Sequence, residues 1–124
     1  MVGIAQYTDA NGNQWNKTVP ITKGTKFNTS VTANTNIFAA SLSPTVSPTV
    51  FRIYCCFDAV GMVKIQRTFS AVTVAETLNL GASLLANVSY MFDFLVDPSE
   101  TINIQYTANA TALKISVVEI AGDA

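Results

Sequence analysis

The chain of 124 residues contains no histidine. Histidine is the usual general base near neutral pH and the commonest protein ligand of transition metals. Two carboxylate pairs could still perform acid and base chemistry, Asp93 with Asp97 and Asp58 with Glu76. We expect Asp97 in a turn and Asp58 at a strand end, where solvated or capping carboxylates are common. The sequence therefore predicts a protein that is not an enzyme and has no catalytic residue, cofactor or metal site.

Charged residues are also scarce, at 12% of the chain, against about 25% in an average globular protein. Seven basic and eight acidic residues give a net charge of −1, and Lys and Arg form no cluster. The electrostatic footprint of a nucleic-acid-binding protein is therefore absent. No run of about 20 apolar residues is available to cross a membrane. We expect neither nucleic acid nor a membrane among the partners.

A surface with so little charge needs other polar residues, and Thr, Ser and Asn are abundant. Threonine favours extended backbone because its Cβ is branched. Such an exterior suits a β protein of a particle or of the extracellular space, and with little charge repulsion between copies we expect self-association. Residues 1–14 lack the basic start and the apolar core of a secretory signal. The expected location is a virion or the extracellular space, with no signal peptide visible.

The two cysteines, Cys55 and Cys56, are neighbours. Neighbouring residues of a strand point to opposite faces, and a disulfide between them needs strained geometry. We expect two free thiols that act as small apolar fillers, or else one disulfide from each cysteine to another chain. The pair indicates neither a disulfide framework nor a metal site.

Alternating apolar and polar residues recur in the second half of the chain, which is typical of sandwiches and barrels. The sequence predicts a single all-β domain over residues 1–124, an antiparallel β-sandwich of about eight strands with a jelly-roll-like arrangement. The strands expected in this half are 51–58, 62–69, 72–78, 88–96, 102–106 and 112–120. We expect 88–96 to be the strongest strand, in the core, and 79–87 to cross between the sheets with room for one helical turn.

The first half is less regular. Asn11-Gly12 predicts a hairpin between 4–7 and 14–19, so that residues 1–20 form an N-terminal arm or an edge hairpin. Two more strands are expected at 27–31 and 36–42. Two Ser-Pro dipeptides then favour an extended loop.

Five residues are candidates for recognition. Trp15 and Tyr54 could form a flat platform for a sugar ring, although Trp15 could instead anchor the arm against the sandwich. Asp93 is expected either to face solvent or to form an ion pair with Arg52 or Arg67 of another chain. These three charged residues are therefore the candidate polar contacts of a subunit interface.

Over a little more than half its length the chain carries patterns of strand residues, which are Phe51-Arg52-Ile53-Tyr54, Glu76-Thr77-Leu78-Asn79 with Gly81, Tyr90-Met91-Phe92-Asp93 and Leu113-Lys114-Ile115-Ser116-Val117-Val118-Glu119-Ile120. In these patterns the chain resembles small virion proteins of tailed bacteriophages and related viruses. The resemblance implies a jelly-roll domain that trimerises and serves as a capsid decoration or as a head or tail fibre component. It implies no active site.

The leading hypothesis is thus a non-enzymatic virion structural protein, a homotrimer that contacts other virion proteins. One alternative is a carbohydrate- or receptor-binding module, with Trp15 or Tyr54 in a groove and a surface glycan or receptor as the partner. Another is a subunit of an extracellular filament, whose N-terminal segment completes the sheet of a neighbour.

Overall fold

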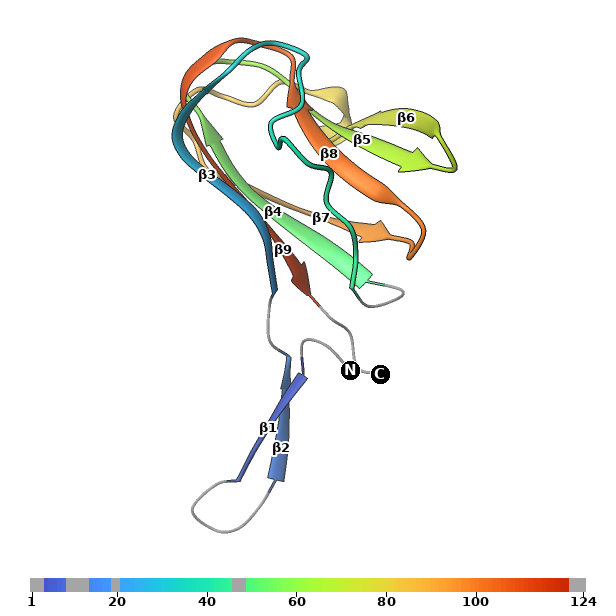
Figure 1. The fold of residues 1–124 in the computed structure, drawn as a ribbon. Helices are drawn as coiled ribbons and strands as arrows, with labels where there is room; N and C mark the ends of the chain where they lie inside the picture. Colours follow the sequence, from blue (N-terminus) through green and yellow to red (C-terminus); the bar gives the residue numbers. More distant parts are fainter. Residues whose placement is uncertain (1–3, 9–13, 19–20, 46–48, 121–124) are drawn as a thin grey trace.

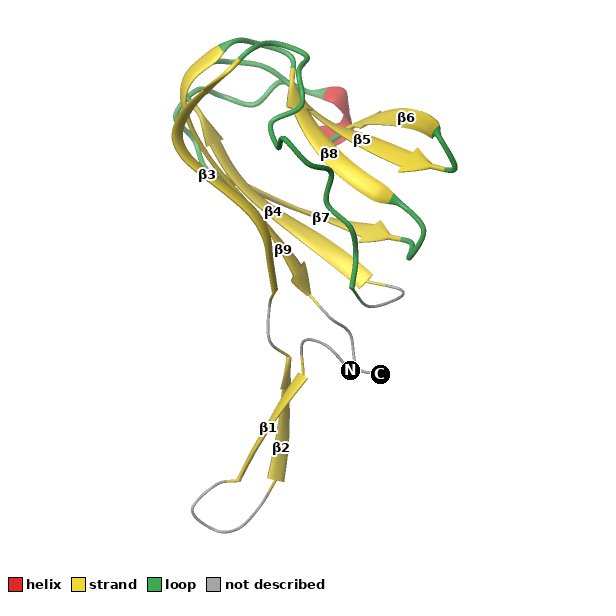
Figure 2. Cartoon of the chain, viewed as in Figure 1, coloured by secondary structure: helices red, strands yellow, loops and turns green. Residues whose placement is uncertain are grey.

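The computed structural model describes residues 4–8, 14–18, 21–45 and 49–120, and of 4–8, 14–18 and residue 21 it describes the backbone alone. Strands make up most of these residues, as Figure 2 shows. The helical element among them is one short 3-10 turn, η1 (Asn79–Gly81), in the connection where the sequence left room for such a turn. The chain is therefore all-β in the part that the structure describes.

Seven strands form two antiparallel sheets that face each other as a β-sandwich (Figure 1). In the four-stranded sheet the order is β3 (Ile21–Val31), β9 (Ala110–Ile120), β4 (Thr49–Phe57) and β7 (Tyr90–Val96). In the three-stranded sheet the order is β6 (Val72–Thr77), β5 (Val63–Phe69) and β8 (Thr101–Tyr106). The antiparallel sandwich predicted from the alternation is confirmed.

The core consists of the inward-facing residues of both sheets. The alternation in β4 and β9 is confirmed, because one face of each strand is buried and the other is not. The largest fully buried side chains include Phe51, Ile53, Phe57, Ile65, Ile102, Ile104, Tyr106 and Ile115. The rings of Phe57 and Tyr106 stack across the sheets with centroids 3.8 Å apart. Burial of these aliphatic and aromatic groups is the main stabilising contribution to the fold.

Strand β7 is less buried than its sequence predicts. Phe94 and Val96 lie in the core, but Tyr90 and Phe92 are only partly buried and Val88 is exposed. The reason is topological, since β7 is an edge strand with a neighbour on one side only. Alternation identified the face of the strand correctly, but not its place in the sheet.

The prediction of a regular strand at 36–42 was wrong. Only isolated bridges join this segment to β8, at Asn36 with Gln105 and at Leu42 with Ile102. Between them the buried Asn103 side chain takes the place of a backbone neighbour, accepting a hydrogen bond from the Phe38 amide at 3.3 Å and donating one to the Phe38 carbonyl at 2.9 Å. The segment therefore covers the edge of β8 without forming a continuous ladder.

The predicted N-terminal hairpin is present. Strands β1 (Ile4–Thr8) and β2 (Gln14–Thr18) pair in antiparallel fashion, with Tyr7 opposite Trp15. In Figure 1 this hairpin extends away from the two sheets. The turn at Asn11-Gly12 lies outside the described residues.

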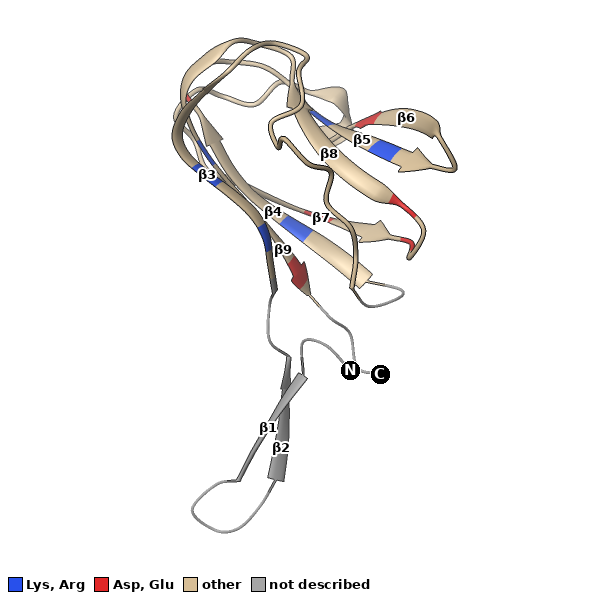
Figure 3. Cartoon of the chain, viewed as in Figure 1, with Lys and Arg blue, Asp and Glu red and all other residues tan. Residues whose placement is uncertain are grey.

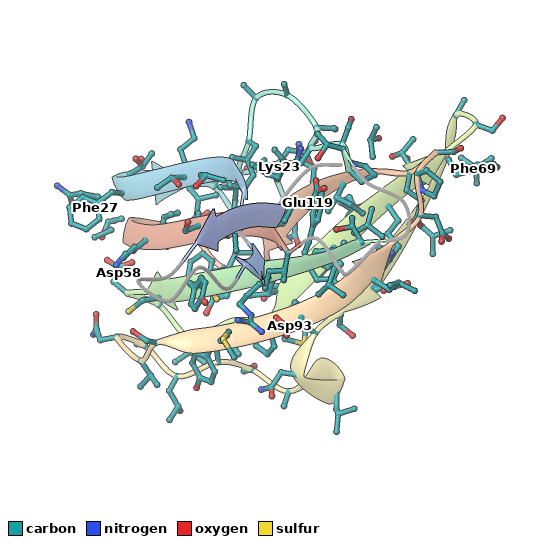
Figure 4. All side chains as sticks on the ribbon, turned by 90° about the horizontal axis from the view of Figure 1, so that it is seen from below. Lys23, Phe27, Asp58, Phe69, Asp93 and Glu119 are labelled. Carbon is teal, nitrogen blue, oxygen red and sulfur yellow. The ribbon has the colours of Figure 1, made fainter. Side chains whose placement is uncertain are left out.

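A buried carboxylate joins β3, β9 and the segment before β4. The Glu119 side chain is fully buried and accepts hydrogen bonds from the Thr45 hydroxyl at 2.7 Å and the Thr45 amide at 2.9 Å. Lys23 Nζ lies 3.1 Å away, and Figure 4 shows the two charged residues side by side. Burial favours the neutral acid, but the contacts with Thr45 and Lys23 outweigh it and lower the pKa of Glu119. The ionised form is therefore the native one.

Replacing this carboxylate tests its contribution. A lowered pKa in the folded state means that ionised Glu119 stabilises the fold above the unfolded-state pKa of about 4.3, and that this stabilisation disappears as the pH falls through the folded-state pKa. We expect Glu119→Gln to lower the free energy of unfolding by about 2 kcal/mol at neutral pH, as measured by urea denaturation. At pH 3 the difference between the two proteins should be smaller. An equal difference at both values would contradict this account.

Candidate assembly surfaces

Arg52 and Asp93 lie directly opposite each other on β4 and β7. The Arg52 guanidinium donates two hydrogen bonds to the Asp93 carboxylate, from Nε to Oδ1 at 2.7 Å and from Nη2 to Oδ2 at 2.9 Å. The hydrogen bonds from Arg52 lower the pKa of Asp93, and the same contact raises the pKa of Arg52. The ion pair that the sequence suggested between chains is thus formed within one chain. A role of these residues at a subunit contact stays a prediction.

Large apolar side chains surround this ion pair on the outer face of the four-stranded sheet. Tyr54 is 42% exposed, Met91 53% and Leu95 57%. Tyr54 and Met91 are register partners, so they lie next to each other across β4 and β7. We call the face formed by Tyr54, Met91, Leu95 and the Arg52–Asp93 pair the sheet surface. Figure 4 looks toward this side of the molecule, with Asp93 labelled.

A second apolar surface lies at the free end of the β5–β6 hairpin. Val74 is the register partner of Arg67, and Val72 is that of Phe69, so these four side chains share the inner face of the hairpin. Nearer the middle of β5 the same face is fully buried at Ile65. Toward the hairpin end, however, Phe69 is 57% exposed, Val72 64% and Val74 56%. In Figure 1 this end projects past the four-stranded sheet, so no second layer covers it within the part of the chain that the structure describes.

The exposed residues line a groove of about 700 Å³, which we call the hairpin groove. Its lining residues are Arg67, Phe69, Ser70, Val72, Val74, Glu76 and Glu100. The walls are mostly apolar, and of the three charged side chains Glu76 is half-exposed whereas Arg67 and Glu100 are mostly buried. The hairpin groove therefore combines three exposed apolar side chains, Phe69, Val72 and Val74, with a cluster of three charged ones.

Arg67 holds the base of this groove together. Its Nη1 donates to the Leu95 carbonyl at 2.7 Å and lies 3.2 Å from Glu100 Oε2, which ties β5 to the end of β7 and the following turn. Its Nε is 3.0 Å from Glu76 Oε1, within ion-pair distance but not aligned for a hydrogen bond. The guanidinium also lies 5.4 Å from the centre of the Phe94 ring. Arg67 is therefore a structural cation of the open end of the sandwich.

The sheet edges differ in their protection against pairing with another chain. Edge strand β3 contains Lys23 and Lys26, and its register with β9 shifts at three places. Edge strands β6 and β7 contain no Lys or Pro and pair with their neighbours without a shift. Lysines and bulges are the usual devices that prevent edge-to-edge association. Their absence from β6 and β7 leaves that side of the sandwich open to a partner.

The remaining candidate residues have local structural roles. Asp58 accepts hydrogen bonds from the amide and hydroxyl of Thr111, which lower the pKa of Asp58. Asp97 lies in the turn after β7, as expected. The paired carboxylates considered for catalysis thus find different partners, since Asp58 contacts Thr111, Glu76 contacts Arg67 and Asp93 contacts Arg52.

The two cysteines are free thiols on opposite faces of β4. Burial raises the pKa of Cys55 to about 12, and Cys56 is half-buried. Among the residues that the structure describes, no group of three Cys, Asp or Glu side chains could hold a metal ion. The described part of the chain also contains no helix with the length and apolar character needed to span a membrane.

The aromatic candidates are placed only in part. Tyr54 lies on the open sheet surface and not in the hairpin groove. Trp15 lies in β2, but its side chain is outside what the structure describes. The comparisons with known proteins add no assignment, because no family model matches the chain and no curated protein is similar enough to match.

Removing Arg67 tests whether it supports the open end of the sandwich. We expect Arg67→Ala to lower the free energy of unfolding by about 1.5–3 kcal/mol, because Glu100 and the Leu95 carbonyl lose a charged donor. Lys64→Ala is the matched control, since Lys64 is a cation of the same strand with one exposed hydrogen bond to Asn34. Its effect should stay within about 0.5 kcal/mol. Similar small losses in both variants, measured by urea denaturation, would contradict the role of Arg67.

Proposed function

We propose that the chain is a non-enzymatic structural protein of a virion, a homotrimeric jelly roll that serves as a capsid decoration or as a head or tail fibre component. Its partners are then other copies of itself and neighbouring virion proteins. The virion assignment comes from the resemblance of the strand patterns after Phe51. Self-association has support from the surfaces described above.

The strand order supports a jelly roll. From β3 in the four-stranded sheet the chain crosses to the segment beside β8 and returns to β4. It then crosses to β5 and β6 in the three-stranded sheet and returns to β7. A last crossing to β8 is followed by β9 in the four-stranded sheet. Repeated crossing between two packed antiparallel sheets is the feature of double Greek-key sandwiches, which are common among viral capsid domains. The irregular segment 36–42 lies beside β8, where an eighth strand would extend the second sheet.

The observation that carries the proposal is the exposure of two apolar surfaces on a molecule with very few charges. Contiguous apolar patches on soluble proteins usually mark sites of interaction. The sheet surface and the hairpin groove together expose six large apolar side chains, and charged residues are sparse over the rest of the sandwich (Figure 3). Self-association would bury these apolar side chains and so remove them from water.

The test is the solution mass of the purified chain by light scattering across a range of concentrations. We expect a species of three times the chain mass, which dissociates on dilution according to mass action. A monomer at every concentration would contradict the proposal and direct attention to Tyr54 and Trp15 as ligand-binding residues. Long polymers would contradict the closed trimer and favour a filament subunit.

A further inference from the structure

The hairpin groove and the sheet surface are complementary in composition, and they belong to different parts of one chain. Each exposes three large apolar side chains. Figure 4 shows Phe69 at one end of the molecule and Asp93 near the middle of the four-stranded sheet, so the two surfaces do not form one patch. Among the exposed apolar residues that the structure describes, these six therefore form two separate surfaces.

The hairpin groove is net acidic, whereas the sheet surface is neutral and has a cation, Lys114, beside it. The groove contains two carboxylates, Glu76 and Glu100, and one cation, Arg67. On the sheet surface the Arg52–Asp93 ion pair is neutral. Cys56 follows Tyr54 by two residues in β4 and so points to the same face. Lys114 is the register partner of Cys56 and therefore adds a cation to that face. A cation beside the sheet surface favours contact with the net acidic groove of another copy, whereas groove against groove would bring two net negative charges together.

From these observations we infer that the partner of the hairpin groove is the sheet surface of a second copy of this chain. The groove side chains Phe69, Val72 and Val74 of one copy then pack on Tyr54, Met91 and Leu95 of the next. A contact between two different surfaces is heterologous, so every copy both gives and receives one contact, and a ring of copies closes when the rotation allows it. The inference rests on the proposed self-association and specifies its interface.

The protection of the edges is consistent with this partner. In such a contact the unprotected edges β6 and β7 lie at the interface. Edge β3, which carries the lysines and the register shifts, lies at the far side of the four-stranded sheet. The chain thus blocks pairing at the edge that stays in water and leaves open the edge that a neighbour covers.

One glutamate in each surface tests the inference. Val72→Glu places a charge in the groove, and Met91→Glu places one on the sheet surface. Both positions are exposed in the single chain, so each variant should fold with an unchanged urea midpoint. Each variant alone should lose self-association, with an apparent dissociation constant raised roughly 30-fold or more. Val60→Glu is the matched control, an exposed apolar residue in the loop between β4 and β5 that belongs to neither surface, and it should assemble like the original chain.

Mixing the two variants gives the decisive measurement. The groove of the Met91→Glu chain and the sheet surface of the Val72→Glu chain are both intact, so an equal mixture should form a species of twice the chain mass. If groove packed on groove, Met91→Glu would assemble normally and the mixture would gain nothing, which would overturn the inference. Assembly that survives in both variants would overturn the inference but leave the proposed function standing. An original chain that stays monomeric would overturn both.

Discussion

The packing of one sheet against the other is the constraint on which the rest of the structure depends. Every inward-facing side chain needs a facing layer to leave water, and over β4, β9 and most of β5 and β8 it has one. The β5–β6 hairpin does not, because it projects past the four-stranded sheet (Figure 1). Three apolar side chains of its inner face, Phe69, Val72 and Val74, therefore remain in contact with water in the single chain.

The polar groups of the sandwich are arranged around this constraint. Near edge strand β3, the buried Glu119 carboxylate loses its hydrogen bonds to water and accepts one from Thr45 instead, beside an ion pair with Lys23. Beside the hairpin groove, Arg67 of β5 bonds to the Leu95 carbonyl at the end of β7 and to Glu100 in the turn that follows. On the outer face of the four-stranded sheet, Arg52 and Asp93 neutralise each other beside the exposed Tyr54, Met91 and Leu95.

Much of the sandwich could be predicted from the sequence, because alternation with period two identifies which residues share a face. The buried faces of β4 and β9 follow directly from it. The irregular segment 36–42 could not be predicted, since it depends on the side chain of Asn103, more than sixty residues away in sequence. The partial exposure of β7 depends on sheet order, which no local pattern encodes.

The candidate surfaces were accessible to sequence reasoning only in part. Arg52, Asp93 and Tyr54 could be named as charged or aromatic residues of predicted strands, but the pairing of Arg52 with Asp93 depends on the register of two strands distant in sequence. From the sequence, Val72 and Val74 are predicted only as residues of a strand at 72–78. Alternation shows which face they share with Phe69, but it cannot show that no second sheet covers that face.

The central claim is that the open side of the sandwich is covered by another copy of the chain. Amide hydrogen exchange, followed above and below the concentration at which the protein associates, tests it most directly. The account predicts that the β6 amides and those of β7 gain protection with rising concentration, while the amides of edge strand β3 exchange at an unchanged rate. Equal exchange of β6 at all concentrations, in a protein that does associate, would contradict it.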